Sequence, residues 1–186
     1  MAYQSLYRRY RSKTFQELVG QDHIVTALKN AVTENRVGHA YLFSGPRGTG
    51  KTSTARILGK ALNCINLQEG GEPCCECDSC ASFTDGTSYD LQELDAASNN
   101  GVEAVRELIS KVALGSPGKT KIYILDEVHM LTTGAENALL KTLEEPPSHV
   151  VFILATTEPH KVAPTIRSRT QPVSYTHLRA HETAYY

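Results

Sequence analysis

The chain has 186 residues, of which 40% are hydrophobic and 21% charged, as in a globular protein with room for one full core. Nineteen Lys and Arg against 20 Asp and Glu give a net charge of −1, so the surplus of positive charge that an autonomous nucleic-acid binder needs is missing. No apolar run is long enough to span a bilayer, and residues 1–5 lack the layout of a signal peptide. We therefore expect a cytoplasmic protein without membrane contact.

The N-terminal stretch 7–15 is basic and aromatic. We interpret it as a strap that packs its tyrosines on the domain; the alternative is an arm that binds nucleic acid. Asp22 then has the character of a helix N-cap. The helix that it opens places apolar residues on one face, namely Ile24, Val25, Leu28, Ala31 and Val32.

Residues 45–52 fit the phosphate-loop pattern G-x-x-x-x-G-K-[ST] at every fixed position. The apolar stretch 39–44 before the loop predicts a buried strand, and 53–62 after it predict a helix. Glycines let successive backbone N–H groups point at an anion, and the helix N-terminus adds unpaired donors. We therefore expect nucleotide binding rather than an ordinary glycine-rich turn, with Lys51 at the β- and γ-phosphates and the Thr52 hydroxyl on Mg²⁺. The expected nucleotide-binding residues of this loop are Gly45, Pro46, Arg47, Gly48, Thr49, Gly50, Lys51, Thr52 and Ser53.

All 5 cysteines lie within a short segment that follows the predicted helix. Cys74, Cys77 and Cys80 form two successive C-x-x-C steps, and Cys64 supplies a further thiolate from the end of that helix. Four sulfurs suit tetrahedral Zn²⁺ in a structural site, which has no open position for catalysis. Cys75 is then the spare thiol. The alternatives are an iron–sulfur cluster with the same ligands and a set of free reduced cysteines.

The next stretches predict a strand over 89–95, a turn, and an amphipathic helix over 102–109. Stretch 121–127 is almost wholly apolar up to its last two residues, which is typical of a central strand in a parallel sheet. Asp126 and Glu127 then lie at the edge of the sheet where such folds bind ligands. We expect Asp126 to hold Mg²⁺ and Glu127 to orient the attacking water; two solvated acids are the alternative.

The last informative stretches are a predicted helix over 134–145, which Pro146 stops, and a second wholly apolar strand over 150–155. Thr156 and Thr157 follow that strand, where a hydroxyl either contacts the γ-phosphate or the lytic water or only caps the strand end. Together these elements predict a three-layer α/β domain with a mainly parallel central sheet and an inserted cysteine module.

The order of motifs along the chain resembles that of the AAA+ ATPases. These motifs are the phosphate loop, the strand that ends in Asp126 and Glu127, the strand followed by Thr156 and Thr157, and Ser168-Arg169. From about Tyr3 to Gln171 the chain resembles more closely the clamp-loader subunits of bacterial DNA polymerase III. The motifs that carry this closer resemblance are Thr14-Phe15, Val19-Gly20-Gln21, residues 39–45, the four-cysteine module, residues 126–131 and residues 137–147.

The resemblance implies an ATP-hydrolysing motor that opens the sliding clamp and loads it onto primed DNA in replication, with ATP, Mg²⁺ and Zn²⁺ as cofactors. Its implied partners are the related loader subunits (delta, delta-prime and further copies of the motor subunit), the sliding clamp and primed DNA, in a hetero-oligomer; the fragment alone is expected to be monomeric. The resemblance also implies that Arg169 acts as an arginine finger in trans and that Thr157 is the first sensor. Tyr7, Arg11 and Val19 would line the adenine and ribose pocket.

From Pro172 or Val173 onward the chain stops resembling the family and has the character of translated vector sequence. We therefore expect an ATPase domain over 1–171 and a non-native tail over 172–186, with the family's lid and collar domains missing. The sheet edge beside the first strand is then either filled by residues 173–176 or left open.

Two other functions are considered against this interpretation. The first is a structural subunit of the same loader that does not hydrolyse ATP, and the intact Lys51, Thr52, Asp126 and Glu127 argue against it. The second is another AAA+ machine that processes DNA, such as a Holliday-junction helicase motor. The cysteine module argues against that one.

Overall fold

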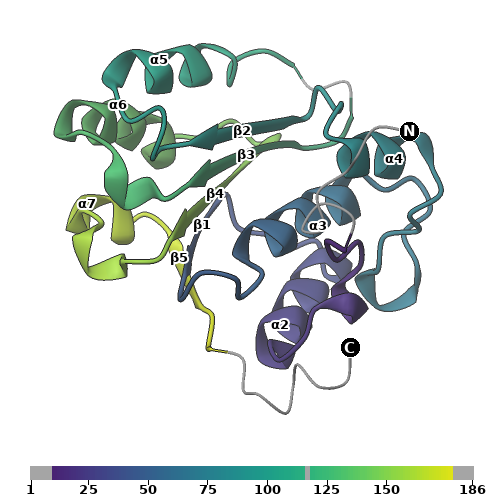
Figure 1. The fold of residues 1–186 in the computed structure, drawn as a ribbon. Coiled ribbons are helices and arrows are strands. Elements are labelled where there is room, and N and C mark those ends of the chain that lie inside the picture. Colours follow the sequence, from purple (N-terminus) through teal and green to yellow (C-terminus); the bar gives the residue numbers. More distant parts are fainter. Residues whose placement is uncertain (1–9, 116–117, 178–186) are drawn as a thin grey trace, which may run out of the picture.

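A computed structural model describes residues 10–115 and 118–177, in which helices and the strands of one sheet alternate along the chain (Figure 1). The strands are β1 (Ala40–Ser44), β2 (Leu91–Asp95), β3 (Lys121–Asp126), β4 (Val150–Thr156) and β5 (Gln171–Ser174). The α-helices are α2 (Asp22–Thr33), α3 (Lys51–Asn63), α4 (Asp78–Asp85), α5 (Val102–Ser110), α6 (Thr133–Glu144) and α7 (Pro164–Arg167). Short 3-10 turns are η1 (Phe15–Glu17), η2 (Glu69–Gly71), η3 (Val128–Met130) and η4 (Pro159–Lys161).

The 5-stranded sheet has the order β2-β3-β4-β1-β5, and every paired neighbour runs parallel. Strands β3, β4 and β1 therefore end side by side at the same edge of the sheet. The segments that leave these three ends carry Asp126 and Glu127, then Thr157, and then the phosphate loop. This order of strands brings together side chains that are far apart in the sequence.

Helices cover both faces of the sheet, with α2, α3 and α4 on one face and α5, α6 and α7 on the other (Figure 1). Strand β3 has side chains in both cores because successive residues point to opposite faces. Ile122 and Ile124 belong to the core under α3, whereas Tyr123 and Leu125 belong to the core under α6. A strand buried on both faces explains its continuous apolar sequence, and the predicted three-layer fold is confirmed.

The predicted helices and strands are present, with ends that shift by one or two residues. Asp22 was expected to cap helix α2 but is its first helical residue, so that prediction is wrong. The N-cap is Gln21, whose side chain bonds Thr176 instead of a helix N–H. The sequence did not predict helix α4, which lies within the cysteine module.

The N-terminal strap is held by a different aromatic residue from those expected. Tyr10 is 73% exposed, so the prediction that the strap packs its tyrosines on the domain is wrong at this position. Phe15 is fully buried instead and belongs to the core beneath α2 and α3. A phenyl ring gains more from burial than a tyrosine because it has no hydroxyl to desolvate. Tyr7 lies outside the described residues.

Of the two alternatives for the sheet edge beside β1, the structure has the filled one. Strand β5 pairs with β1, and Tyr175 after it is buried against Phe43. The proposed boundary between a native domain and a non-native tail at residue 172 stays a prediction. Within the described part of the chain, no helix combines the length and the apolar character that crossing a membrane requires.

Candidate functional site

The phosphate loop connects β1 to α3 through a backbone that only glycine adopts easily. Gly50, directly before the first residue of α3, has φ +93°. Gly45 has φ +147°, and a Cβ atom there would lie 2.5 Å from the carbonyl oxygen of Tyr175. Glycine is therefore needed at these two positions for the loop to fold in this way. The absence of a side chain also leaves the backbone N–H groups open to an anion.

Lys51 begins helix α3, and its ammonium group lies inside the loop. Its Nζ donates hydrogen bonds to the carbonyl oxygens of Gly45 at 2.8 Å and Pro46 at 2.7 Å. Burial lowers the pKa of Lys51, and the nearby carboxylates of Glu127 and Asp126 oppose that shift. The cation is thus held at the centre of the loop beside two acids from the end of β3.

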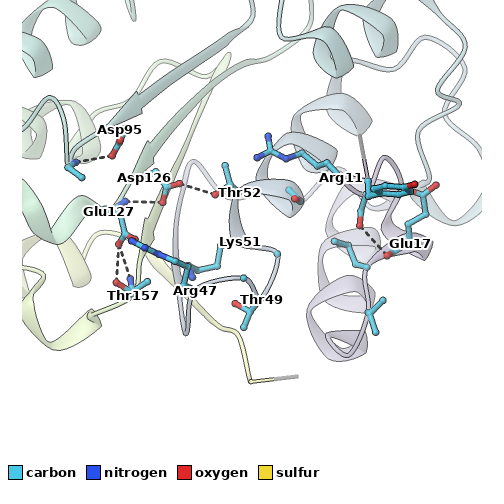
Figure 2. Close-up of a pocket in the computed structure, with 18 residues that line it drawn as sticks. Arg11, Glu17, Arg47, Thr49, Lys51, Thr52, Asp95, Asp126, Glu127 and Thr157 are labelled. Carbon is cyan, nitrogen blue, oxygen red and sulfur yellow. Dashed lines mark hydrogen bonds and ion pairs between the residues drawn. The ribbon is translucent and has the colours of Figure 1, made fainter. Parts of the chain in front are cut away.

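Thr52 and Asp126 meet across the gap between α3 and β3, as Figure 2 shows. The Thr52 hydroxyl donates to Oδ2 of Asp126 at 2.9 Å, while Oδ1 accepts a bond from the backbone N–H of Glu127 at 2.9 Å. Both side chains offer hard oxygen atoms at one place, which is the donor type that Mg²⁺ prefers. These residues therefore fit a magnesium ion.

Glu127 directly follows β3 in a left-handed backbone conformation with φ +50°, which is uncommon for a residue other than glycine. Its Oε2 accepts bonds from the Thr157 hydroxyl at 3.0 Å and the Thr157 backbone N–H at 3.4 Å. The Arg47 guanidinium lies 3.5 Å from its other oxygen. Glu127 is thereby aimed over the phosphate loop, with its side chain 16% exposed (Figure 2).

One cavity of about 610 Å³ is lined by Lys51, Thr52, Asp126, Glu127 and Thr157, but not by Gly45 or Pro46 of the loop. The phosphate loop and the acidic ends of β2 and β3 form one side, and the strap forms the other, with Arg11 and Glu17 across the cavity from Asp126 (Figure 2). Of the residues expected at the base and ribose, Arg11 and Val19 line the cavity. The loop residues that line it are Arg47, Gly48, Thr49, Gly50, Lys51, Thr52 and Ser53.

Arg169 is the one expected catalytic residue that does not line this cavity within the described chain. Its guanidinium forms an ion pair with Glu144 at the end of α6, and its Nη1 donates to the carbonyl oxygen of Thr165 at 2.7 Å. The arginine is therefore on a different part of the surface from the cavity.

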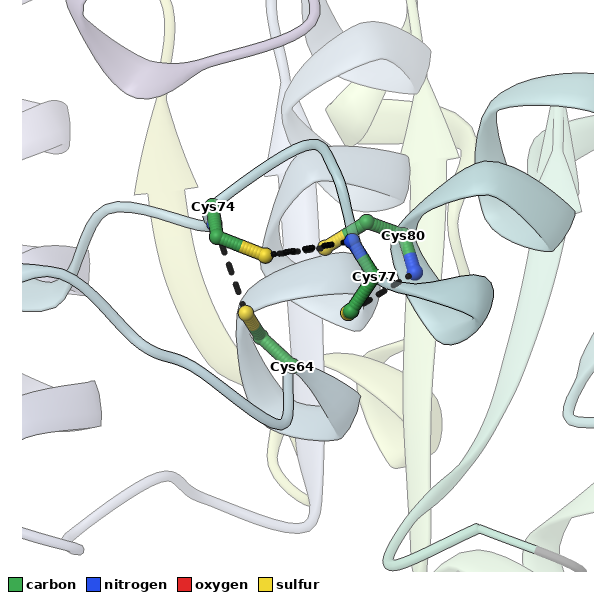
Figure 3. A group of neighbouring side chains, drawn as sticks. All are labelled: Cys64, Cys74, Cys77 and Cys80. Atoms are coloured by element: carbon green, nitrogen blue, oxygen red, sulfur yellow. Dashed lines mark hydrogen bonds between the residues drawn. The ribbon is translucent and has the colours of Figure 1, made fainter.

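The four cysteines expected to bind zinc form one cluster (Figure 3). The Sγ atoms of Cys64, Cys74, Cys77 and Cys80 all lie within 4.8 Å of one another, and those of Cys74 and Cys80 are 3.9 Å apart. Four thiolates around one zinc ion at the usual bond length have Sγ atoms about 3.8 Å apart. Cys75 is also free but does not belong to this cluster.

Backbone N–H groups donate to sulfur within the same cluster, from Cys74 to Cys64 Sγ at 3.3 Å, from Cys77 to Cys74 Sγ at 3.4 Å and from Cys80 to Cys77 Sγ at 3.5 Å. The N–H groups of Glu76 and Cys77 lower the pKa of the Cys74 thiol to about 6. Such donors stabilise a thiolate at Cys74, whereas burial raises the pKa of the Cys64 and Cys80 thiols. The residues fit a zinc ion through the close approach of their four Sγ atoms.

Sequence reasoning missed two polar residues at the site. Asp95 ends β2 directly beside Asp126 in the sheet register and lines the cavity. The His129 side chain is 6% exposed, with Nδ1 2.9 Å from the Thr156 hydroxyl and 3.5 Å from Oε2 of Glu127, and Nε2 3.3 Å from a carboxylate oxygen of Glu158. The signal for Asp95 was its place at the end of a predicted strand. His129 had no such signal because Thr156 and Glu158, which it contacts, are distant in the sequence and are brought to it by the end of β4.

Comparison with known proteins places the chain in a family. Residues 20–179 match the family model described as DNA polymerase III, delta subunit. The DNA polymerase III subunit tau of Bacillus subtilis is 56% identical over 92% of this chain, and that of Escherichia coli is 52% identical over 91%. The chain spans 30% and 26% of the length of these two relatives.

Two solved structures from Thermotoga maritima share the fold. A DNA polymerase III gamma subunit-related protein has a TM-score of 0.56 at 24% identity, covering 83% of this chain and 46% of its own. The RuvB Holliday junction branch migration motor has a TM-score of 0.63 at 19% identity, covering 93% and 51%. The fold is thus of the AAA+ type, and the chain belongs to the DNA polymerase III, delta subunit family, in which it matches the N-terminal region of the gamma/tau subunits.

Proposed function

We propose that this chain is the ATP-hydrolysing motor region of a clamp-loader subunit of bacterial DNA polymerase III, acting in the cytoplasm. In replication it would help to open the sliding clamp and load it onto primed DNA, together with delta, delta-prime and further gamma/tau subunits. The observation that carries the proposal is the convergence of Lys51, Thr52, Asp126 and Glu127 on one cavity. The names of the relatives, which are DNA polymerase III subunits, support the role in replication.

ATP would lie with its phosphates on the loop and its base toward the strap. The Lys51 ammonium would leave the carbonyl oxygens of Gly45 and Pro46, 2.8 and 2.7 Å away, and pair with the β- and γ-phosphates. Thr52 and Asp126 would hold Mg²⁺, which when bound neutralises charge on the phosphate oxygens. Arg11 and Val19 would contact the base and ribose, as expected also of Tyr7.

Glu127 would orient the attacking water and draw its proton toward Oε1 or Oε2. Thr157 bonds Oε2 from both its hydroxyl and its backbone N–H, so it fixes the direction in which the carboxylate points. This contact supports Thr157 as the sensor over Thr156, whose hydroxyl faces His129 instead. Whether the phosphate site is occupied would thereby affect Thr157, which follows the end of β4.

Arg169 would act in the ATP site of a neighbouring subunit. An arginine supplied in trans neutralises charge in the transition state of phosphoryl transfer and raises the rate by roughly 10³–10⁵ in comparable systems. Its position outside the cavity of its own chain supports this role. The four-cysteine cluster would hold Zn²⁺ with a structural function only, because four thiolates leave no open coordination position.

The decisive experiment compares the unmodified protein with Glu127→Gln in ATP binding and in phosphate release. The variant keeps the shape of the side chain but loses the base, so we expect ATP to bind with unchanged affinity while turnover falls by about 10²-fold or more. Glu145→Gln, at an exposed acid at the end of α6, is the matched control and should turn over normally. Normal turnover by Glu127→Gln would refute the assignment of Glu127. An unmodified protein that binds ATP in the complete loader without turnover would be a structural subunit.

A further inference from the structure

The N-terminal strap continues past residue 15, and its described part, residues 10–19, forms one wall of the nucleotide cavity. Arg11, Ser12, Leu18 and Val19 line that cavity, yet the strap has a single turn of 3-10 helix, Phe15–Glu17. The strap has internal hydrogen bonds from Ser12 and Lys13 to Glu17 and from Leu18 to Phe15, but these do not fix where it lies against the rest of the protein. Its position across the cavity therefore depends on contacts with other elements.

One such contact is a buried carboxylate in the cysteine module. Glu72 has a side chain that is 10% exposed and does not line the cavity. Its Oε2 accepts the backbone N–H of Phe15 at 3.0 Å, and its Oε1 accepts the ammonium of Lys29 in α2 at 3.0 Å. A buried charge costs free energy unless it is fully paired, and here one of its two partners is the backbone of the strap.

A second buried charge holds the strap two residues earlier. Lys60, in the last turn of α3, is 3% exposed and donates from Nζ to the carbonyl oxygen of Lys13 at 3.0 Å. The Cys75 thiol donates to the same carbonyl oxygen at 3.6 Å. Helix α3 begins in the phosphate loop, so Lys60 connects the strap to the element that carries the phosphate site.

We propose that Glu72 and Lys60 are positioning residues of the nucleotide site, an inference that rests on the proposed function. Neither touches the cavity; each fixes the backbone of the strap so that residues 11–19 stand opposite the phosphate loop. Glu72 also lies two positions before Cys74, so order in the cysteine module is transmitted to the base and ribose side of the pocket.

Two probes separate this role from a general effect on the fold. ATP with Mg²⁺ uses both walls of the cavity, whereas inorganic tripolyphosphate with Mg²⁺ uses the phosphate loop alone. For Glu72→Gln we expect the Kd for ATP to rise about tenfold relative to the unmodified protein, as the loss of one charge-assisted hydrogen bond implies, and the Kd for tripolyphosphate to stay unchanged. Glu69→Gln removes an exposed acid of the same loop and should change neither.

Lys60→Met is the second variant, because it retains the aliphatic part of the side chain and removes only the ammonium group. It tests the positioning role independently if Glu72→Gln does not fold. It should weaken ATP binding and spare tripolyphosphate, while Lys141→Met, at an exposed lysine of α6, should alter neither. An equal loss for both ligands, or no loss for ATP, in a folded variant would overturn this inference alone. Failure of the unmodified protein to bind ATP would overturn the proposed function and this inference with it.

Discussion

The Thr52 hydroxyl donates a hydrogen bond to Oδ2 of Asp126 over 2.9 Å and so joins the first turn of α3 to the end of β3. The two residues are 74 positions apart in the sequence. The contact exists because β1 and β3 flank β4 and all three strands end at the same edge. The oxygen atoms of the expected magnesium site are therefore close together through the fold itself, so little reorganisation is needed to bind the ion.

Asp126→Asn tests this pair directly. The amide keeps the shape but removes the charge that favours Mg²⁺, so we expect ATP affinity in Mg²⁺ to fall about tenfold or more, toward the affinity measured in EDTA. Titration of ATP with and without Mg²⁺ measures the difference. Asp85→Asn, at an exposed acid at the end of α4, should keep the full magnesium effect. An Asp126→Asn protein with the same magnesium dependence as the unmodified one would exclude Asp126 as a ligand.

Thr157→Val should separate turnover from binding. Valine has nearly the same volume but cannot donate the 3.0 Å bond to Glu127, so the carboxylate loses its orientation while the phosphate loop is untouched. We expect kcat to fall about tenfold with little change in the Kd for ATP, measured by phosphate release and equilibrium binding. Thr87→Val, at an exposed threonine after α4, should leave both values unchanged. A parallel loss of affinity would mean that Thr157 contacts the nucleotide directly.

Arg169→Ala is expected to act only between subunits. ATP binding by the variant should be normal because Arg169 does not line its own cavity. ATPase activity of the complete loader should fall about 10³-fold or more at the sites that receive this arginine. Arg167→Ala changes an exposed arginine two positions away and is the control, which should retain activity. Equal activity of the two variants in the assembled complex would remove Arg169 from the mechanism.

Much of this architecture could be predicted from the sequence because its strongest signals are local. The phosphate loop is contiguous, and β3 and β4 are apolar apart from their polar end residues because both of their faces are buried. The features that could not be predicted depend on contacts between residues that are far apart in the sequence. His129 meets Thr156 through the neighbouring strand, and Glu72 meets Phe15 across 57 positions. No local pattern encodes such contacts.

The errors also have physical causes. Helix α4 is short and begins within the repeated cysteines, so its apolar pattern is weak, although Asp78 stands in its first turn and Gly86 caps its end in the left-handed conformation. Tyr10 was expected to pack but is exposed, because Phe15 is the residue of the strap that enters the core.

The cysteine cluster gives a prediction with an internal control. Purified protein should contain about one zinc ion per chain, and Cys77→Ser should lose it because serine is a poor ligand for this metal. Cys75→Ser should keep the zinc because Cys75 lies outside the cluster. Metal analysis measures both, and thermal unfolding should show a lower Tm for Cys77→Ser only. A well-folded unmodified protein without metal would refute zinc binding.

Tyr123→Phe should stabilise the protein. Tyr123 lies in β3, is fully buried and stacks on Phe152, but among the described residues its hydroxyl has no hydrogen-bond partner. Removing that hydroxyl ends a desolvation cost, so the free energy of unfolding should rise by about 1 kcal/mol, as measured by urea denaturation. Tyr89→Phe, at a tyrosine that is 82% exposed, should change nothing.

The same substitution has a pH dependence of known sign. Burial raises the pKa of Tyr123 from 10.0 to about 12, so above pH 10 the unfolded chain releases a proton that the folded chain keeps. The unmodified protein therefore loses stability as pH rises from about 10 to about 12, and Tyr123→Phe lacks this contribution. Other buried tyrosines titrate alike in both proteins, so the stability difference should widen over that interval. A constant difference would show that burial does not raise the pKa of Tyr123, and a less stable variant at neutral pH would show that the hydroxyl is paired in solution.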